Sequence, residues 1–308
     1  MRIVSLLPSA TEIVYALGLG DQLEAVTDEC DFPAEAQHKP VVSRSVLPQG
    51  RPLSSREIDA AVHERIDGDQ PLYRLDTDLI RRIRPDVILT QDLCRVCAVP
   101  SGRVQQALDQ IGASEARVLS LEPKSLEQIL ESIEAVGRLL GVEERATEVV
   151  RLLRDRIESV RRRAARLPSI QVFCLEWLDP PFVAGHWIPD MVEIVGGVNL
   201  LNGKEQPSRQ VTWRQIRDVS PEVVVFMPCG YYLEEAEDEL AALMANAEFA
   251  ETPAARERSV FAVDATSYFS RPGPRIVDGL EIMAWAIHPD AFPHPPEGSI
   301  MRAGRRSG

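Results

Sequence analysis

Hydrophobic residues recur at two spacings along the chain, and each spacing predicts a different kind of element. From 143 to 166 an apolar side chain returns every three or four residues, with no Gly or Pro in the run. This spacing predicts one helix that is roughly 36 Å long at about 1.5 Å per residue. Short apolar runs such as 86–90 and 222–227 are instead typical of buried strands. We expect the long helix to be a strut that joins two lobes.

Strand-like runs alternate with helical patterns on both sides of the strut. Before it, we expect strands at 2–7, 23–27, 86–90 and 117–120 and helices at 9–18, 78–84, 101–111 and 125–140. After it, we expect strands at 170–175, 222–227 and 260–263 and helices at 190–196, 213–219, 233–247 and 276–287. Such alternation predicts an α/β fold with parallel sheets. The Pro- and Ser-rich residues 34–74 predict a loop with one short helix near 55–66.

Polar residues mark where several of these helices begin. Ser9 with Glu12, and Ser125 with Gln128, have the spacing of a capping box, in which the first side chain caps the helix and the second reaches back. Ser101 is expected to cap the helix that it opens.

The two halves share one pattern at residues 80–89 and 216–225. Each has two apolar residues three apart, then a Pro, an acid and a buried strand. Because Pro is a natural stop between a helix and a strand, the repeat favours two Rossmann-like lobes of like design. The expected organisation is an N-terminal α/β lobe at 1–124, a helical connector at 125–168, a C-terminal α/β lobe at 169–290 and a flexible tail at 291–308.

Length and charge narrow the class of protein. The 308 residues exceed the usual single core, which agrees with two domains. The 34 basic and 47 acidic residues give a net charge of 34 − 47 = −13, which argues against nucleic acid as a partner.

The chain shows no run of about eighteen apolar residues, so we do not expect a membrane-inserted protein. The apolar stretch at its start is interrupted by Ser5 and ends at Pro8, so it does not resemble a signal peptide. The lack of a signal-peptide pattern, together with an odd number of cysteines (five), predicts a reduced, cytoplasmic protein. The alternative is a periplasmic or cell-surface protein whose start codon is mis-assigned.

Aromatic residues gather in the loops that follow the expected strands. In open α/β sheets, ligands bind beyond the carboxyl ends of strands. Only 17 aromatic residues occur in the chain, and eight fall in these loops: Phe32, Trp177, Phe182, Trp187, Tyr231, Tyr232, Tyr268 and Phe269. Aromatic faces with a few polar groups suit a large flat ligand. The alternative is that several of them pack the lobes together.

The cysteines offer a second, weaker candidate site. Cys94 and Cys97 form a lone CxxC motif, and Cys30 lies in another loop at the same expected edge. A metal ion at Cys30, Cys94 and Cys97 is one interpretation, and two packed thiols are the other. No GxGxxG, P-loop, GxSxG or HExxH motif is present, so we expect no enzyme; the alternative is a metal- or thiol-dependent enzyme that uses these three cysteines.

At this point the residues carry a family resemblance. The chain resembles the helical-backbone substrate-binding proteins of vitamin B12 and iron–siderophore uptake by ABC transporters, most closely the cobalamin-binding branch. The matching stretches are 3–18 (IVSLLPSATEIVYALG), 26–33 (VTDECDFP), 84–89 (RPDVIL), 182–201 and 270–276 (SRPGPRI), and the resemblance covers about residues 2–290.

The resemblance implies two rigid α/β lobes, a non-enzymatic function, and a cobalamin or related metal chelate held in the interlobe cleft. By position, Phe32 and Phe182 match aromatic ligand contacts of the two lobes, and Arg271 matches a polar contact. Together with the loop analysis, the expected ligand-binding residues are Pro8, Ser9, Phe32, Phe182, His186, Trp187, Tyr231, Tyr268 and Arg271.

The chain departs from the transport members at several positions. Those members dock on a membrane permease through one exposed acid in each lobe. Asp78 fits the first position, whereas the second is Arg214, which has the opposite charge. A tryptophan expected near Ser208 is missing, and Ser267 stands where an acid is expected. Transporter-dependent uptake of cobalamin or an iron–siderophore is therefore kept as an alternative to a binding protein without a permease.

Overall fold

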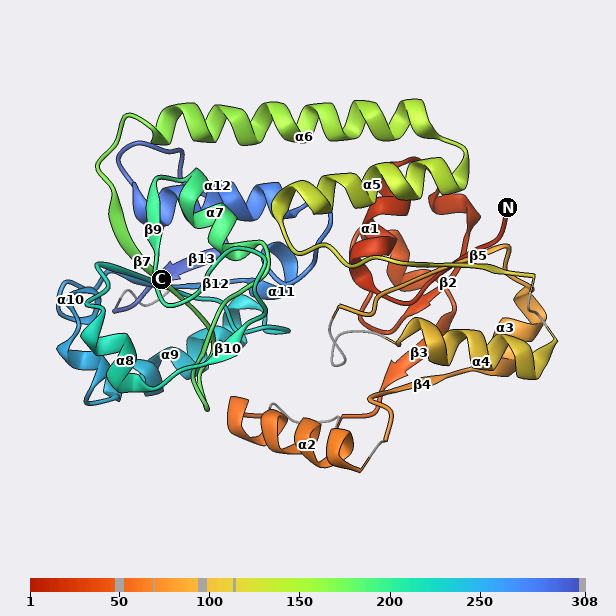
Figure 1. Ribbon diagram of the computed structural model, residues 1–308, viewed down its shortest axis with the longest axis horizontal. Coiled ribbons are helices and arrows are strands. Elements are labelled where there is room, and N and C mark those ends of the chain that lie inside the picture. Colours follow the sequence, from red (N-terminus) through yellow and green to blue (C-terminus); the bar gives the residue numbers. More distant parts are fainter. Residues whose placement is uncertain (48–52, 69, 94–98, 113–114, 305–308) are drawn as a thin grey trace. The chain divides into compact units, whose positions relative to one another are not determined.

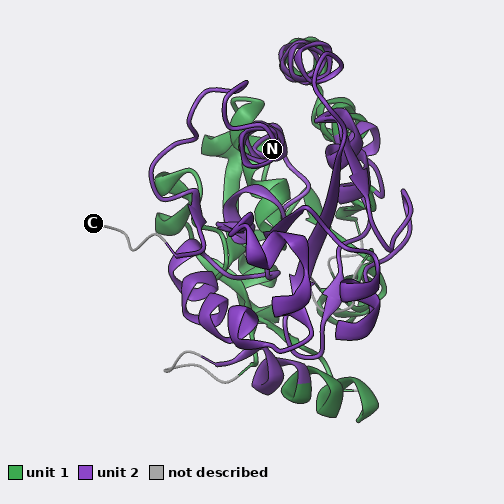
Figure 2. Ribbon diagram, turned by 90° about the vertical axis from the view of Figure 1, so that its left-hand side faces the viewer, with its two compact units in different colours: residues 1–51, 60–123, 130–151 green, residues 52–59, 124–129, 152–308 purple. Residues whose placement is uncertain are grey.

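The computed structural model describes residues 1–47, 53–68, 70–93, 99–112 and 115–304. The chain forms two compact units, shown in different colours in Figure 2. Unit 1 comprises Met1–Arg51, Ala60–Pro123 and Leu130–Arg151, and unit 2 comprises Pro52–Asp59, Lys124–Ile129 and Leu152–Gly308. The chain changes unit within three helices, namely α2 (Ser55–Asp67), α5 (Leu126–Leu140) and α6 (Glu143–Ala164). Helix α6 is the expected strut (Figure 1).

Unit 1 is built on a six-stranded sheet of order β4-β3-β2-β1-β5-β6. Its strands are β1 (Ile3–Ser5), β2 (Leu23–Thr27), β3 (Val41–Ser45), β4 (Tyr73–Leu75), β5 (Val87–Thr90) and β6 (Arg117–Ser120). Its other helices are α1 (Pro8–Ala16), α3 (Thr77–Ile83) and α4 (Ser101–Ile111), with short 3₁₀ turns at Gly20–Gln22 and Ala34–His38. The strands pair in parallel except β4, which lies antiparallel at one edge.

Unit 2 is built on a seven-stranded sheet of order β10-β8-β7-β11-β12-β13, with β9 also paired to β7. Its strands are β7 (Ile170–Trp177), β8 (Phe182–Val183), β9 (Gly197–Asn199), β10 (Arg209–Gln210), β11 (Val223–Phe226), β12 (Val260–Val263) and β13 (Ile300–Arg302). Its helices are α7 (Ile188–Ile194), α8 (Trp213–Asp218), α9 (Leu233–Ala245), α10 (Pro253–Arg256), α11 (Ala265–Tyr268) and α12 (Ile276–Ile287), with a 3₁₀ turn at Phe249–Glu251.

The central strands of both sheets are buried on both faces, which is what parallel sheets covered by helices require. In unit 1, β5 is fully buried beside β1. In unit 2, β11 is fully buried between β7 and β12, and Phe173 and Phe226 are among the largest buried side chains. The prediction of α/β lobes with parallel sheets is confirmed, with antiparallel strands added at the edges.

The repeated pattern of the two halves corresponds to a repeated hydrogen bond. Each helix is followed by a residue with positive φ, Arg84 after α3 and Ser220 after α8, directly before the Pro. The acid after that Pro accepts the main-chain N–H of the neighbouring strand: Arg2 donates to Asp86 at 2.6 Å, and Gln171 donates to Glu222 at 2.8 Å. The acid of the pattern therefore fixes the start of one strand against the next.

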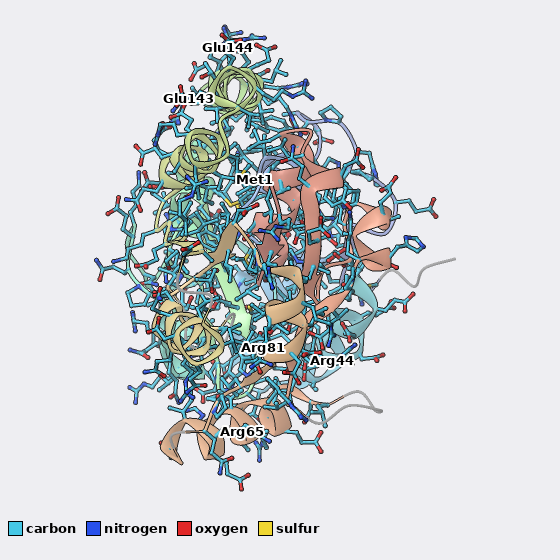
Figure 3. The ribbon with its side chains drawn as sticks, turned by 90° about the vertical axis from the view of Figure 1, so that its right-hand side faces the viewer. Met1, Arg44, Arg65, Arg81, Glu143 and Glu144 are labelled. Carbon is cyan, nitrogen blue, oxygen red and sulfur yellow. The ribbon has the colours of Figure 1, made fainter. Side chains whose placement is uncertain are left out.

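Helix α6 carries its charges where they suit the helix dipole. Glu143 and Glu144 project from its first turn (Figure 3), and three arginines lie in its last turn. Within unit 2, Arg156 of α6 reaches Asp278 at 2.5 Å and Glu281 at 2.8 Å on α12, and Figure 1 shows the two helices side by side. These ion pairs raise the pKa of Arg156, mainly through the hydrogen bond to Glu281.

Six strands were not expected from the sequence, and β8, β9 and β10 of unit 2 are three of them. Strands β3 and β4 lie in the segment expected to be a loop, and β13 lies in the segment expected to be a flexible tail. All of these strands are short, and β4 and β13 gain their hydrogen bonds by lying antiparallel to an existing edge, β4 on β3 and β13 on β12. A partner distant in sequence, rather than a local pattern, defines them.

Two expected helix caps are wrong. Helix α1 begins at Pro8 with Leu7 at the N-cap position, so Ser9 lies inside the first turn and cannot cap it. Helix α4 has Pro100 at the N-cap position, and the Asp92 carboxylate accepts from the main-chain N–H of Ser101 at 2.7 Å instead. The Ser125 side chain does accept from the main chain of Gln128 at 3.3 Å, but the Gln128 side chain reaches back to Lys124 instead of Ser125.

Candidate functional site

The first candidate residues of unit 1 lie where β1 ends and α1 begins. Pro8 and Ser9 are both buried there, and the Ser9 hydroxyl oxygen has no hydrogen-bond partner among the residues that the structure describes. A buried hydroxyl without a partner is unusual in a folded protein. The structure thus places both residues at the carboxyl edge of the sheet, as expected, but beneath its surface.

Phe32 is a partly exposed aromatic residue at the same edge. It follows β2, and 45% of its surface is exposed, which is high for so large an apolar residue. The turn that carries it is held from both sides: Cys30 donates its main-chain N–H to Thr27 at 3.1 Å, and Gln37 donates to the main chain of Asp31 at 3.1 Å. A held loop with an exposed ring is the local geometry of an aromatic ligand contact.

The acids next to Phe32 are engaged within the unit. Asp28 accepts from the main-chain N–H of Ser45 at 3.3 Å, and Glu29 accepts from the Tyr73 hydroxyl at 3.2 Å. Both carboxylates therefore act as hydrogen-bond acceptors that fix the loops after β2 and β3.

The structure gives no support to a metal ion at the cysteines. Cys30 is buried, and its sulfur lies 3.1 Å from the Thr11 hydroxyl oxygen. Cys94 and Cys97 lie outside the described residues. Among the residues that the structure describes, no group of three His, Cys, Asp or Glu side chains is arranged to hold a metal ion.

In unit 2, Phe182 is the first residue of β8, and His186 and Trp187 lie in the turn between β8 and α7. Phe182 is partly buried and pairs with Trp177 across the hairpin. Trp187 is buried, and its indole N–H donates to the main-chain oxygen of Phe269 at 2.9 Å. The His186 ring lies 5.7 Å from the Trp187 ring and is only partly buried, so it is the more accessible of the two.

His186 is held in a demanding backbone conformation. Its φ is +52°, its main-chain N–H donates to Gln206 at 2.6 Å, and its carbonyl accepts from Glu205 at 3.2 Å. Burial, and then the positive charge of Lys124, lowers its pKa, which favours the neutral imidazole. A neutral, partly exposed imidazole can bond to a ligand or accept a proton.

Sequence reasoning missed a pocket beside this turn. Gly185 packs so closely against the loop that a Cβ would lie 2.4 Å from the main-chain oxygen of Gln206 and the main-chain nitrogen of Ser208. The Ser208 hydroxyl links Gly185 to Glu176, 2.7 Å away. The segment that Gly185 packs against lines a pocket of about 610 Å³. The residues that line this pocket are Leu201, Asn202, Gly203, Gln206, Pro207 and Arg209. Only the close approach at Gly185 has a sequence signal, a Gly after a strand.

The aromatic residues after β11 divide into a covered and an open one. Tyr231 is 6% exposed and donates its hydroxyl proton to the main-chain oxygen of Leu53 at 3.1 Å. Tyr232 is 41% exposed and caps α9, where the Glu235 carboxylate accepts from its main-chain N–H at 2.8 Å. The burial of Tyr231 raises its pKa above the usual value.

Tyr268 is the last residue of α11, the short helix after β12, and Arg271 lies in the loop that follows α11. Tyr268 is partly buried, and the Arg275 guanidinium lies 5.7 Å from its ring centroid. Arg271 is buried, and its charge, like that of Arg275, opposes the rise that burial causes in the pKa of Asp264. This loop therefore offers a charged but largely enclosed group.

Trp177 was noted as a loop aromatic but was not among the expected ligand-binding residues. It is the last residue of β7, its ring meets the Tyr231 ring edge to face at 5.5 Å, and its indole N–H donates to the main-chain oxygen of Ser55 at 3.2 Å. Its place at the carboxyl end of a central strand was the available signal.

Two α/β units with loops gathered at the carboxyl ends of parallel strands define the class of two-lobed solute-binding folds. Comparison with known proteins agrees with this class. The sequence pattern of the family described as "Periplasmic binding protein" matches residues 3–266, and the chain belongs to that family.

Relatives of this chain include binding proteins for cofactors. A "Vitamin B12-binding protein" of Vibrio cholerae serotype O1 is 28% identical over 284 residues, which cover 91% of this chain and 86% of that protein. An "Uncharacterized ABC transporter substrate-binding lipoprotein YvrC" of Bacillus subtilis is 24% identical and covers 94% of this chain and 81% of its own length.

Solved structures show the same fold. The periplasmic vitamin B12 binding protein BtuF of Vibrio cholerae superposes with a TM-score of 0.66 at 26% identity, covering 93% of this chain and 96% of its own. A periplasmic heme binding protein from Pseudomonas aeruginosa superposes with a TM-score of 0.72 at 22% identity, covering 100% and 99%. Among the described residues, no helix is long and apolar enough to span a membrane. The names of these relatives give no support to the cytoplasmic location expected from the sequence.

Proposed function

We propose that this chain is a non-enzymatic binding protein for cobalamin or a related planar metal chelate such as heme or a ferric siderophore. The exposed ring of Phe32 carries this proposal, because it follows β2 at the position where the resemblance places an aromatic ligand contact. The 28% identity to a vitamin B12-binding protein over most of both chains supports the ligand class.

Unit 2 supports the proposal with groups of matching chemistry. The exposed Tyr232 ring and the neutral, partly exposed His186 imidazole lie in loops at or near the carboxyl edge of its sheet. Aromatic rings bind flat apolar faces, and an imidazole can bond to a metal or to a polar side group. Phe182, Tyr268 and the buried Arg271 complete this set of proposed contacts.

Transport through an ABC permease is the second part of the proposal. The family and the lipoprotein relative favour a location in the periplasm or at the cell surface over the cytoplasm. Asp78, the first expected docking acid, is exposed and pairs with Arg81 at 2.6 Å. Arg214, at the second position, is exposed and lies 3.7 Å from Asp218, so docking would depend on a permease surface that accepts a basic residue there.

Titration calorimetry tests the binding proposal. Purified protein is titrated with cyanocobalamin, hemin and a ferric siderophore. We expect at least one to bind with a Kd well below about 100 μM, which corresponds to a binding free energy of about −5.5 kcal/mol. Failure of all three to bind more tightly than this would refute the proposed ligand class.

A further inference from the structure

Residues 53–59, which we call the strap, pack against an aromatic pair in unit 2. The Tyr231 hydroxyl donates to the main-chain oxygen of Leu53 at 3.1 Å, and the Trp177 indole N–H donates to that of Ser55 at 3.2 Å. The two rings meet edge to face, with centroids 5.5 Å apart. Each aromatic side chain thus has its polar atom bonded to the main chain of the strap.

Two further contacts hold the strap through charge. Ser55, the first residue of α2, donates its main-chain N–H to the Glu239 carboxylate at 2.7 Å. A carboxylate at a helix N-terminus is favoured by the helix dipole. The Arg56 guanidinium lies 2.6 Å from the Asp179 carboxylate, with 77% and 44% of the two side chains exposed.

The strap is attached by polar contacts and buries few apolar side chains. Ser54, Arg56 and Glu57 are exposed, and only Ser55 is buried. Hydrogen bonds exchange with water at little net cost, and segments with few buried apolar contacts open most readily. Release of the strap would expose Tyr231 and Trp177 together.

We propose that Trp177 and Tyr231 form a covered aromatic subsite of the ligand site, and that the strap occupies this subsite until the ligand displaces it. The subsite suits a planar chelate that carries carbonyl groups at its edge. The rings would bind the planar face, and ligand carbonyls would replace the oxygens of Leu53 and Ser55. This inference rests on the proposed function, because it assigns the strap as a competitor of that ligand.

If the strap competes with the ligand, the apparent Kd equals the intrinsic Kd divided by the fraction of molecules in which the strap is released. Variants that weaken the strap without touching the aromatic pair should therefore bind the ligand more tightly. Variants that remove the aromatic pair should bind it more weakly. The opposite signs separate competition from a merely structural role.

Proline at position 55 removes one strap contact cleanly. Ser55→Pro lacks the N–H that bonds to Glu239, while proline is well tolerated at the first position of a helix such as α2. Hydrogen bonds to charged groups are the stronger ones, so we expect calorimetry to show an apparent Kd for cyanocobalamin or hemin that is about ten-fold lower. The control is Thr77→Pro, at the first position of α3, for which we expect an unchanged Kd.

The ion pair gives an independent test by charge exchange. Arg56→Asp and Asp179→Arg should each lower the apparent Kd by about two- to five-fold, and the double variant should return it to the wild-type value. Arg81→Ala, which breaks an exposed ion pair of like distance in unit 1, should leave the Kd unchanged.

Removing the subsite should act in the other direction. Trp177→Ala should raise the Kd by about ten-fold or more, as loss of an aromatic anchor does. If neither probe binds the wild type nor any strap variant, the proposed function fails and the competition fails with it. If the wild type binds and the strap variants bind equally or more weakly, only the strap proposal is overturned.

Discussion

Phe32 in unit 1 and Tyr231 in unit 2 both follow parallel strands, β2 and β11, yet their surroundings differ. Phe32 keeps nearly half of its surface exposed, whereas Tyr231 is buried and bonded to Leu53, which is 178 residues away in sequence. The same edge of the same fold thus carries a partly exposed aromatic side chain in one unit and a covered one in the other. An exposed side chain is accessible to a ligand, while a covered one must first lose its cover.

The largest expected effect concerns α6, because the chain passes from one unit to the other between residues 151 and 152. Leu153 is buried and Leu152 is 50% exposed. Leu153→Asp should lower the free energy of unfolding by about 3–5 kcal/mol, since it removes apolar burial and buries a charge.

Leu152→Asp is the matched control and should change the free energy of unfolding by less than about 0.5 kcal/mol. Thermal or urea unfolding followed by circular dichroism measures both. Equal melting of Leu153→Asp and its parent would show that burial of Leu153 does not stabilise the fold.

A glycine comparison tests whether the edge of unit 2 is closely packed. Gly185→Ala would bring a Cβ to 2.4 Å from main-chain atoms, whereas a Cβ added to Gly102 in α4 of unit 1 would have no atom of the described residues within 4 Å. We expect Gly185→Ala to cost about 1–3 kcal/mol of unfolding free energy and to weaken ligand binding. Gly102→Ala should be neutral or slightly stabilising, because alanine favours the helix.

Phe32→Ala tests the exposed aromatic side chain directly. Loss of an exposed ring should leave the unfolding free energy within about 0.5 kcal/mol, yet raise the ligand Kd by about ten-fold, or about 1.4 kcal/mol. Leu152→Ala, which removes another exposed apolar side chain, should leave the Kd as it is. If the two variants bind alike in calorimetry, Phe32 is not a ligand contact.

The smallest effect is a pH dependence of unit 2. Burial lowers the pKa of His186 and of His288 below that of the unfolded chain, about 6.5. Just below pH 6.5 the unfolded chain therefore binds more protons, so this contribution to stability is present above pH 6.5 and is lost as the pH falls. His186→Gln should flatten the decline of the melting temperature between pH 7 and about pH 5; an unchanged slope would contradict it.

The local pattern of the sequence predicted the central elements well. Helix α12 and strands β2 and β12 have the expected bounds, and α6 ends two residues before its expected end at residue 166. Each of these elements buries a regular apolar face. Strands β3, β4 and β13 could not be predicted in the same way. They are short runs of mixed apolar and polar residues, and their pairing partners lie elsewhere in the chain.

The candidate site was predictable as a set of loops but not as a set of exposed side chains. Trp187 is buried, and its indole N–H bonds to the main chain of Phe269, 82 residues away. Tyr231 is covered by a strap from an earlier part of the chain, and Ser9 is buried because α1 starts one residue before it. Which aromatic residue is open depends on these distant contacts, and no local spacing records them.

Hydrogen exchange, measured by mass spectrometry with and without saturating cyanocobalamin or hemin, tests the contrast between the exposed and the covered side chain most directly. The ligand should slow exchange in the peptide that contains Phe32, since it covers an exposed side chain. It should speed exchange in the peptide that contains residues 54–59, since it displaces the strap. Slower or unchanged exchange of residues 54–59 in the bound protein would contradict the account.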